Sequence, residues 1–129
     1  MIQIDSAKLS ESLQKILRQY GDDVREVTRR MVKKSGNEAR DQLKKVSPRR
    51  PKSNKHYADG WTVGDYTWST LGAHVTVYNA KKPGLAHLLE NGHANRNGGR
   101  TRAYVHIKPV EEEVIKTFEE NVRRAIQYV

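Results

Sequence analysis

The sequence contains no cysteine in its 129 residues. A chain without cysteine has no disulfide scaffold, no thiolate ligand for zinc and no thiol nucleophile. Aromatic residues make up only 7% of the chain, and the hydrophobic share of 36% allows one modest core rather than two. No apolar run approaches the ~18 residues that cross a membrane, and the first five residues lack the basic and apolar segments of a secretory signal. We therefore expect one soluble, intracellular domain over residues 1–129.

Acidic side chains are scarce in the middle of the chain. Lysine and arginine number 24 and aspartate and glutamate number 15, which gives a net charge of +9. Residues 44–108 hold twelve of the basic side chains and only three of the acidic ones, so this segment carries the whole net charge. A field of one sign gathered in one segment usually meets phosphate or an acidic protein surface. The alternative is that this charge serves solubility alone.

The first third of the chain predicts one long helix. Apolar residues recur at steps of three and four from Leu9 to Val46, with charged residues between them. Gly21 and Gly36 each weaken a helix interior by about 1 kcal/mol relative to alanine. We expect the helix to continue through both, with a bend at Gly36, and to stop before Pro48, because proline disfavours the helical conformation in its predecessor.

The rest of the chain predicts a small sheet and two more helices. Residues 47–59 are expected to form a flexible basic linker, since residues 47–56 hold two prolines and nothing apolar. The elements expected after it are strands over 60–68 and 73–78 with a turn or bulge at 64–65, a helix over 83–91, a basic hairpin loop over 93–102 with a descending strand through 103–107, and a final helix from Pro109. This order predicts an α+β fold in which helices pack on one face of an antiparallel sheet.

The histidines do not form a convincing metal site. His87, Glu90 and His93 lie around the short helix, but the spacing His-x-x-Glu lacks the second paired histidine that makes helical zinc motifs specific. His106 fits a structural or interface histidine better than a general base. We therefore expect no metal and no other cofactor.

Other catalytic patterns are equally weak. No serine lies in a nucleophile motif, and the pair Gly98-Gly99 matches no phosphate-binding loop. We expect no catalytic residue and no small-molecule substrate. The enzyme alternative is a small basic ribonuclease or toxin, in which His93 or His106 would act with Arg100 or Arg102 stabilising phosphate.

Two basic loops are the better candidates for function. Their basic residues have no acidic neighbours in the sequence, and the loops offer charge to phosphates without a rigid helix that could read a groove. The candidate residues, which would face a DNA passage or an acidic partner, are Arg49, Arg50, Lys52, Lys55, Arg96, Arg100 and Arg102.

The stretch from Gly84 to Arg100 combines a leucine-rich short helix, the tetrapeptide Glu-Asn-Gly-His and a glycine-rich basic loop. It is followed by Val105-His-Ile-Lys-Pro109 and a last helix. This pattern resembles the small tail-component proteins of long-tailed double-stranded-DNA phages, the tail-completion or head–tail joining group. Val105 stands where proline is common in that family. With the N-terminal helix and the linker, the resemblance covers nearly the whole chain.

The resemblance implies a structural virion protein without enzymatic activity, made in the cytoplasm of the bacterial host. It implies a homo-oligomeric ring, of six copies, at the head-proximal end of the tail around the DNA channel. The partners would be neighbouring connector and tail-tube or terminator proteins and passing double-stranded DNA, with no membrane. Which connector layer the ring occupies stays open. The alternative from a different class is a sequence-independent nucleic-acid-binding module acting as a monomer or dimer.

Overall fold

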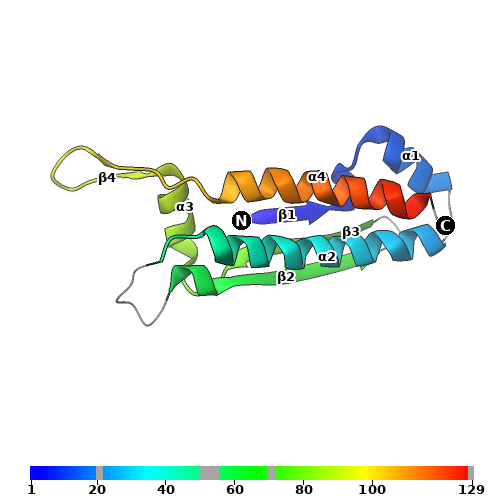
Figure 1. The fold of residues 1–129 in the computed structure, drawn as a ribbon, viewed down its shortest axis with the longest axis horizontal. Coiled ribbons are helices and arrows are strands. Elements are labelled where there is room, and N and C mark those ends of the chain that lie inside the picture. Colours follow the sequence, from blue (N-terminus) through cyan, green and yellow to red (C-terminus); the bar gives the residue numbers. More distant parts are fainter. Residues whose placement is uncertain (20–21, 50–55, 70–71, 128–129) are drawn as a thin grey trace.

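The computed structural model describes residues 1–19, 22–49, 56–69 and 72–127. It confirms the α+β class, with four α-helices and a small antiparallel sheet (Figure 1). In chain order the elements are β1 (Ile2–Asp5), the 3-10 helix η1 (Ser6–Lys8), α1 (Glu11–Gln19), α2 (Asp22–Val46), the 3-10 helix η2 (Tyr57–Gly60), β2 (Trp61–Ser69), β3 (Gly72–Asn79), α3 (Pro83–Asn91), β4 (His93–Ala94), β5 (Arg100–Thr101) and α4 (Ile107–Ile126).

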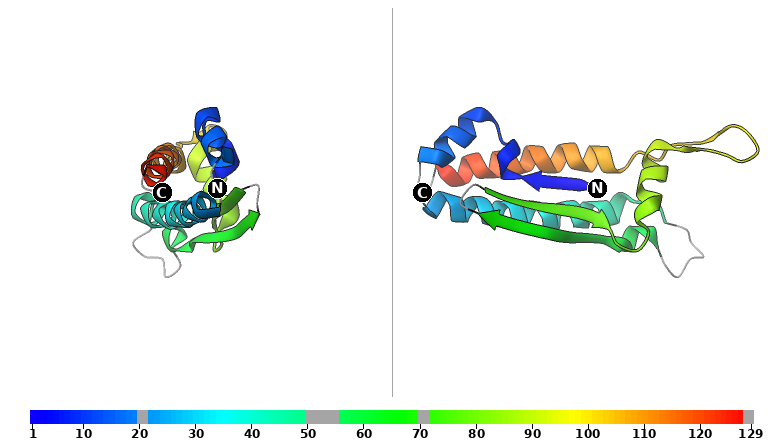
Figure 2. Two further views of the ribbon diagram at one scale, coloured as in Figure 1. Left: turned by 90° about the vertical axis from the view of Figure 1, so that its right-hand side faces the viewer. Right: turned by 180° about the vertical axis from the view of Figure 1, so that it is seen from behind.

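The main sheet has the strand order β1-β3-β2, and both pairings are antiparallel. In the central strand β3, Ala73, Val75 and Val77 are buried at alternate positions, as the period of two predicts. One face of the sheet is covered by α2, and α4 runs antiparallel beside α2 (Figures 1 and 2). The short helix α3 lies across one end of this body, and the β4–β5 hairpin extends away from the same end.

The prediction of a single N-terminal helix is wrong, because α1 and α2 are separate helices that run in different directions (Figure 2). The structure also has β1, which was not predicted and in which Ile2 and Ile4 are fully buried against β3. Gly21, the first predicted weak point, lies outside the described residues. The spacing of the apolar residues alone could not predict β1 or the division into two helices. A short strand followed by two helices can give the same spacing as one long helix.

At Gly36, the second predicted weak point, α2 continues without interruption. A Cβ atom on Gly36 would lie 2.9 Å from Cγ1 of Val75 and 3.4 Å from Cγ1 of Val63. The glycine therefore lets the helix approach the sheet closely instead of bending it.

The predicted flexible linker is anchored at both ends. Ser47 is buried, and Tyr57 and Ala58 are buried within η2. Because residues 47–56 contain no apolar residue, the prediction placed Ser47, Tyr57 and Ala58 in the linker, although the structure buries all three. Residues 50–55 lie outside the described residues.

The last helix also begins earlier than predicted. Because α4 starts at Ile107, Pro109 is its third residue, and the predicted strand over 103–107 does not form. The backbone N–H of Tyr104 instead donates to the carbonyl of Leu89, 2.6 Å away, which draws the chain back to α3 after only two residues of β5. In the part of the chain that is described, no helix has the length and apolar character needed to span a membrane.

The close approach at Gly36 predicts an unusual response to alanine. In an open helix Gly36→Ala would raise the free energy of unfolding by about 1 kcal/mol, but here the new Cβ atom would overlap Val75. We expect a loss of about 1–3 kcal/mol in urea unfolding. The control is Gly84→Ala in α3, where no atom lies within 4 Å and stability should stay level or rise slightly. An unfolding midpoint for Gly36→Ala at or above that of the parent would contradict the close packing.

Candidate functional site

The β4–β5 hairpin and the segment after it form an arm, residues 93–105, that stands clear of the body (Figure 1). Every residue of the arm is exposed. Its turn contains Gly98 and Gly99 in the left-handed region, with φ of 90° and 75°, where glycine is the least strained residue. The arm carries three arginines, Arg96, Arg100 and Arg102, and no acidic side chain. None of the three forms an ion pair with any residue that the structure describes.

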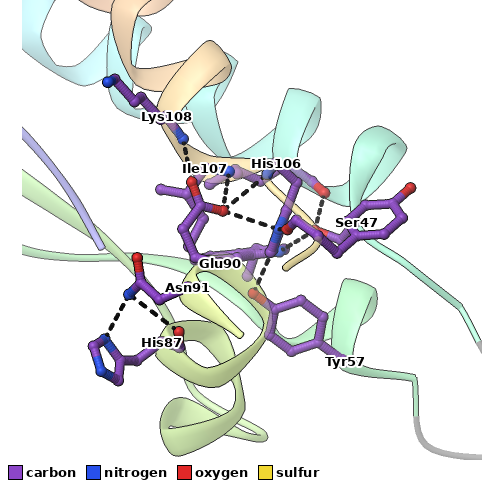
Figure 3. A network of polar contacts seen from close by, with 11 residues as sticks. Ser47, Tyr57, His87, Glu90, Asn91, His106, Ile107 and Lys108 are labelled. Carbon is purple, nitrogen blue, oxygen red and sulfur yellow. Dashed lines mark hydrogen bonds and ion pairs between the residues drawn. The ribbon is translucent and has the colours of Figure 1, made fainter. Parts of the chain in front are cut away.

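The base of the arm is fixed by the carboxylate of Glu90 at the end of α3 (Figure 3). Oε1 of Glu90 accepts from the backbone N–H groups of His106 and Ile107 at 2.8 and 2.9 Å, and Oε2 accepts from that of Lys108 at 2.9 Å. The N-terminal N–H groups of a helix have no partner within the helix, and negative charge there is favourable. Since the first turn of α4 holds no acidic residue of its own, Glu90 supplies the cap from another helix.

The imidazole of His106 lies beneath this cap and is only 1% exposed. Its Nδ1 atom is 2.7 Å from the carbonyl oxygen of Tyr104 and 3.1 Å from Oε1 of Glu90, so Nδ1 carries the proton. Its Nε2 atom lies 2.8 Å from the hydroxyl of Tyr57, within hydrogen-bond distance. Both ring nitrogens are therefore satisfied, and His106 is a structural histidine, as the sequence predicted, although at a helix cap rather than on a strand.

Three further side chains tie the base to the core. The indole N–H of Trp61 donates to the hydroxyl of Ser47 at 2.8 Å, and that hydroxyl donates to the carbonyl of Leu43 in α2. The amide of Asn79 donates to the carbonyl of Tyr57 at 2.7 Å. The arm is thus anchored, through its base, to α2, β2, β3 and α3 at once.

Two pKa shifts follow from this environment. Burial raises the pKa of Glu90, but the three backbone N–H donors and the nearby His106 outweigh burial and hold the pKa of this carboxyl below its usual range. Burial, with the Glu90 charge adding to it, raises the pKa of Tyr57 well above its usual value, so its hydroxyl stays protonated as a donor.

An open groove of about 670 Å³ runs beside the base of the arm. Its walls include Val46, Tyr104, Val105 and Pro109, and Arg102 stands at its rim. The side chains of Tyr104 and Val105 are about half exposed, at 49% and 55%. The root of the arm therefore joins apolar surface to positive charge.

The first basic loop differs from the second. Arg49 forms an ion pair with Asp59 at 3.0 Å and donates to the carbonyl of Lys44. The hydrogen bond from Arg49 is the largest influence that lowers the pKa of Asp59. Arg50, Lys52 and Lys55 lie outside the described residues. Among the candidates that the structure describes, Arg96, Arg100 and Arg102 therefore share the arm, whereas Arg49 pairs with Asp59.

The possible metal ligands are not brought together. Nδ1 of His87 is 3.0 Å from the amide of Asn91, Nε2 of His93 is 3.3 Å from the hydroxyl of Thr101, and Glu90 faces α4 instead of either histidine (Figure 3). No cluster of three residues capable of holding a metal ion occurs among the described residues.

Sequence reasoning missed a second exposed cluster, on the body of the molecule. The guanidinium of Arg29 lies over the ring of Trp68, and the amine of Lys33 lies over the ring of Tyr66. In the sequence, the arginines and lysines of α2 are visible only as charged residues between its apolar positions. The signal that could have found the cluster is the interruption at Gly64-Asp65, which alters the direction of every later side chain in β2.

Comparison with known families gives a clear match. A family model described as "Bacteriophage HK97-gp10, putative tail-component" matches residues 7–92, from η1 to the end of α3. The chain belongs to this HK97-gp10-like family. No curated protein and no solved structure matches the chain.

Family membership confirms the resemblance to phage tail components. As a member of the HK97-gp10-like family, the protein is a structural tail component that interacts with other virion proteins. The matched region includes Glu90, whereas the whole of the arm and the whole of α4 follow it. Glu90 therefore joins the region that defines the family to the segment beyond it.

The cap predicts a pH-dependent cost for Glu90→Gln. An amide keeps one acceptor oxygen but loses the charge and the second acceptor, so we expect a loss of about 1–3 kcal/mol at pH 7. Because folding lowers the pKa of Glu90, its contribution is complete well above the ordinary pKa of 4.5 and disappears as pH falls through the folded value. Urea unfolding at several pH values should show the gap closing in acid.

The matched control is Glu120→Gln, an exposed change on α4, the helix that Glu90 caps. It should alter the free energy of unfolding by less than about 0.5 kcal/mol. A gap between Glu90→Gln and the parent that stays constant down to pH 3 would show that the charge of Glu90 does not stabilise α4.

Proposed function

We propose that this tail component joins head to tail. In this role it assembles as a hexameric ring at the head-proximal end of the tail, around the DNA channel, in the neck of the virion. It is a structural protein, made in the host cytoplasm, without catalytic activity. The single observation that best supports this role is the arm, an anchored, exposed, basic projection on a protein of the tail-component family.

The arm suits a positioning role better than a catalytic one. It holds three arginines and no carboxylate, and the histidine nearest its root is buried and fully hydrogen-bonded. Guanidinium groups on a projection can contact phosphate or carboxylate without desolvating a pocket. Repeated around a ring, such arms form a positive collar, toward either DNA or an acidic neighbouring ring.

Anchoring the arm is what makes it useful in an assembly. A two-stranded hairpin is only marginally stable by itself in water, so a projection without a fixed root would lose entropy when it docks. The Glu90–His106 network holds the root in one orientation. The arms of all the copies would then point the same way, which a symmetric ring requires.

The test replaces Arg96, Arg100 and Arg102 together by serine. The melting temperature should change little, because exposed loop charges contribute little to stability. The yield of infectious particles should fall, with heads and tails accumulating unjoined or with DNA lost from joined particles. The control replaces Lys15, Lys34 and Lys45 by glutamine, which removes three exposed charges elsewhere. Normal particle yields from the arginine variant would show that the arginines of the arm serve solubility alone.

A binding measurement separates the two possible targets of the arm. If DNA is the target, the free protein should bind duplexes of any sequence, and log affinity should fall with log salt by about 0.9 per phosphate contacted. If an acidic neighbouring ring is the target, the parent protein should not bind DNA in this way. The variant with three serines should still fail to join heads to tails. Strong DNA binding by the monomer, with no effect of the variant on particles, would favour the nucleic-acid-binding module instead.

A further inference from the structure

The second exposed cluster forms a compact surface that we call the basic–aromatic patch, consisting of Arg29, Arg30, Lys33, Tyr66 and Trp68. Trp68 is 58% exposed. The guanidinium carbon of Arg29 lies 4.3 Å from its ring centre, and Nζ of Lys33 lies 4.5 Å from that of Tyr66. The patch lines a hollow of about 140 Å³. A large exposed indole framed by cations has the composition of a protein-binding hot spot.

A β-bulge in β2 builds this patch. Val63 and Gly64 pair with Val77 and Thr76, but Thr67 pairs with His74, so β2 contains one extra residue. One extra residue moves all later side chains to the opposite face of the strand. Without the bulge, the face toward α2 would receive Thr67 in place of Tyr66 and Trp68.

The bulge requires a sparsely populated backbone conformation. Asp65 has φ of 53°, the only positive φ of a non-glycine residue in the described part of the chain. Such strain persists only where the surrounding structure enforces it, and it is concentrated at functional positions. Here its effect is to bring two aromatic rings beneath the basic side chains of α2.

A surface of opposite charge lies on α4, beside β1. Residues 111–120 include five glutamates and one lysine, in a chain that is otherwise strongly basic. Glu112, Ile115 and Glu119 follow one another at helical spacing, and Ile115 is 42% exposed between the two carboxylates. Ile115 and Glu119 also line a shallow groove with Asp5 of β1 and with Lys8, and Glu119 forms an ion pair with Arg123 at 3.2 Å. We call Asp5, Glu112, Ile115 and Glu119 the acidic patch.

The two patches are complementary in composition and separate in position. One presents aromatic rings framed by cations, and the other presents an isoleucine framed by carboxylates. The basic–aromatic patch includes residues of β2 and the acidic patch a residue of β1, which are the two outer strands of the sheet. A contact between them must therefore join different copies, and each copy keeps one patch free for the next.

We propose that the basic–aromatic patch of one copy binds the acidic patch of a second copy of this chain. Contacts between two different surfaces are head-to-tail, and they close into a ring when the rotation between copies permits it. The proposal rests on the proposed ring and names the surfaces that would build it. Nucleic acid is a poorer occupant, because Glu26 in the same hollow pairs with Arg29 and Arg30 at 3.5 and 3.6 Å and leaves less positive charge for a phosphate backbone. The isoleucine of the acidic patch, by contrast, can pack against the exposed ring of Trp68.

Cross-linking tests the contact directly, because the natural chain has no cysteine. A Lys33→Cys chain is mixed with a tagged Glu112→Cys chain and treated with a short bis-maleimide. Each chain has one thiol, so a product containing both chains reports contact between copies. We expect several times more of it than from Lys45→Cys mixed with Glu112→Cys, the control with the same chemistry farther along α2.

Charge exchange tests whether the patches recognise each other. Arg30→Glu with Lys33→Glu should raise the dissociation constant for self-association about tenfold or more, measured by sedimentation over a dilution series. Glu112→Lys with Glu119→Lys should do the same, and the chain carrying all four changes should recover. Trp68→Ala should weaken association without any change of charge. Lys34→Glu with Lys45→Glu is the matched control and should leave association intact. Circular dichroism and melting curves confirm that each variant is folded.

Four results would overturn the proposal. The first is cross-linking no stronger than in the control pair. The second is no self-association of the parent protein at high concentration. The third is failure of the fourfold variant to recover association. The fourth is loss of DNA binding, with association unchanged, in the Arg30→Glu and Lys33→Glu variant, which would assign the patch to nucleic acid. The proposed joining function is judged separately, by particle yields from the arm variant, so either idea can fail alone.

Discussion

The capping of α4 by a carboxylate from α3 is the constraint on which the rest of the structure depends. Glu90 reaches across 16 to 18 residues of chain to accept three backbone N–H groups. The arm leaves the body after α3 and returns at the start of α4. The contact between Glu90 and the first turn of α4 therefore closes the loop that the arm forms. An exposed segment of thirteen residues gains a fixed origin because its two ends meet at one partly buried carboxylate.

Local chemistry predicted much of this arrangement. The hairpin loop over 93–102, the helix over 83–91 and the alternation of β3 were all apparent, because each depends on neighbouring residues. The importance of the Glu-Asn-Gly-His stretch was also visible, although only as a resemblance. Its physical role was not predictable, because a carboxylate that caps a distant helix leaves no periodic signal near itself.

The errors share one cause, which is that distant parts of the chain decided the local outcome. β1 forms because Ile2 and Ile4 find partners about seventy residues away in β3, while four residues alone carry little strand signal. Gly36 appeared to be a weak point of a helix, and only the position of Val75 shows why a side chain is excluded there. The hairpin lies where it was predicted, but the strand predicted after it does not form. The backbone N–H of Tyr104 bonds to the carbonyl of Leu89 instead.

The bulge at Asp65 makes the chemistry of one face depend on the length of β2 as well as on its composition. A substitution in that strand changes one side chain and leaves its neighbours in place. A deletion of a single residue would turn Tyr66 and Trp68 away from α2 without altering either of them. Related chains could therefore keep every aromatic residue and still lose this surface, so in comparing them the spacing between Val63 and Trp68 carries more information than the identity of either residue.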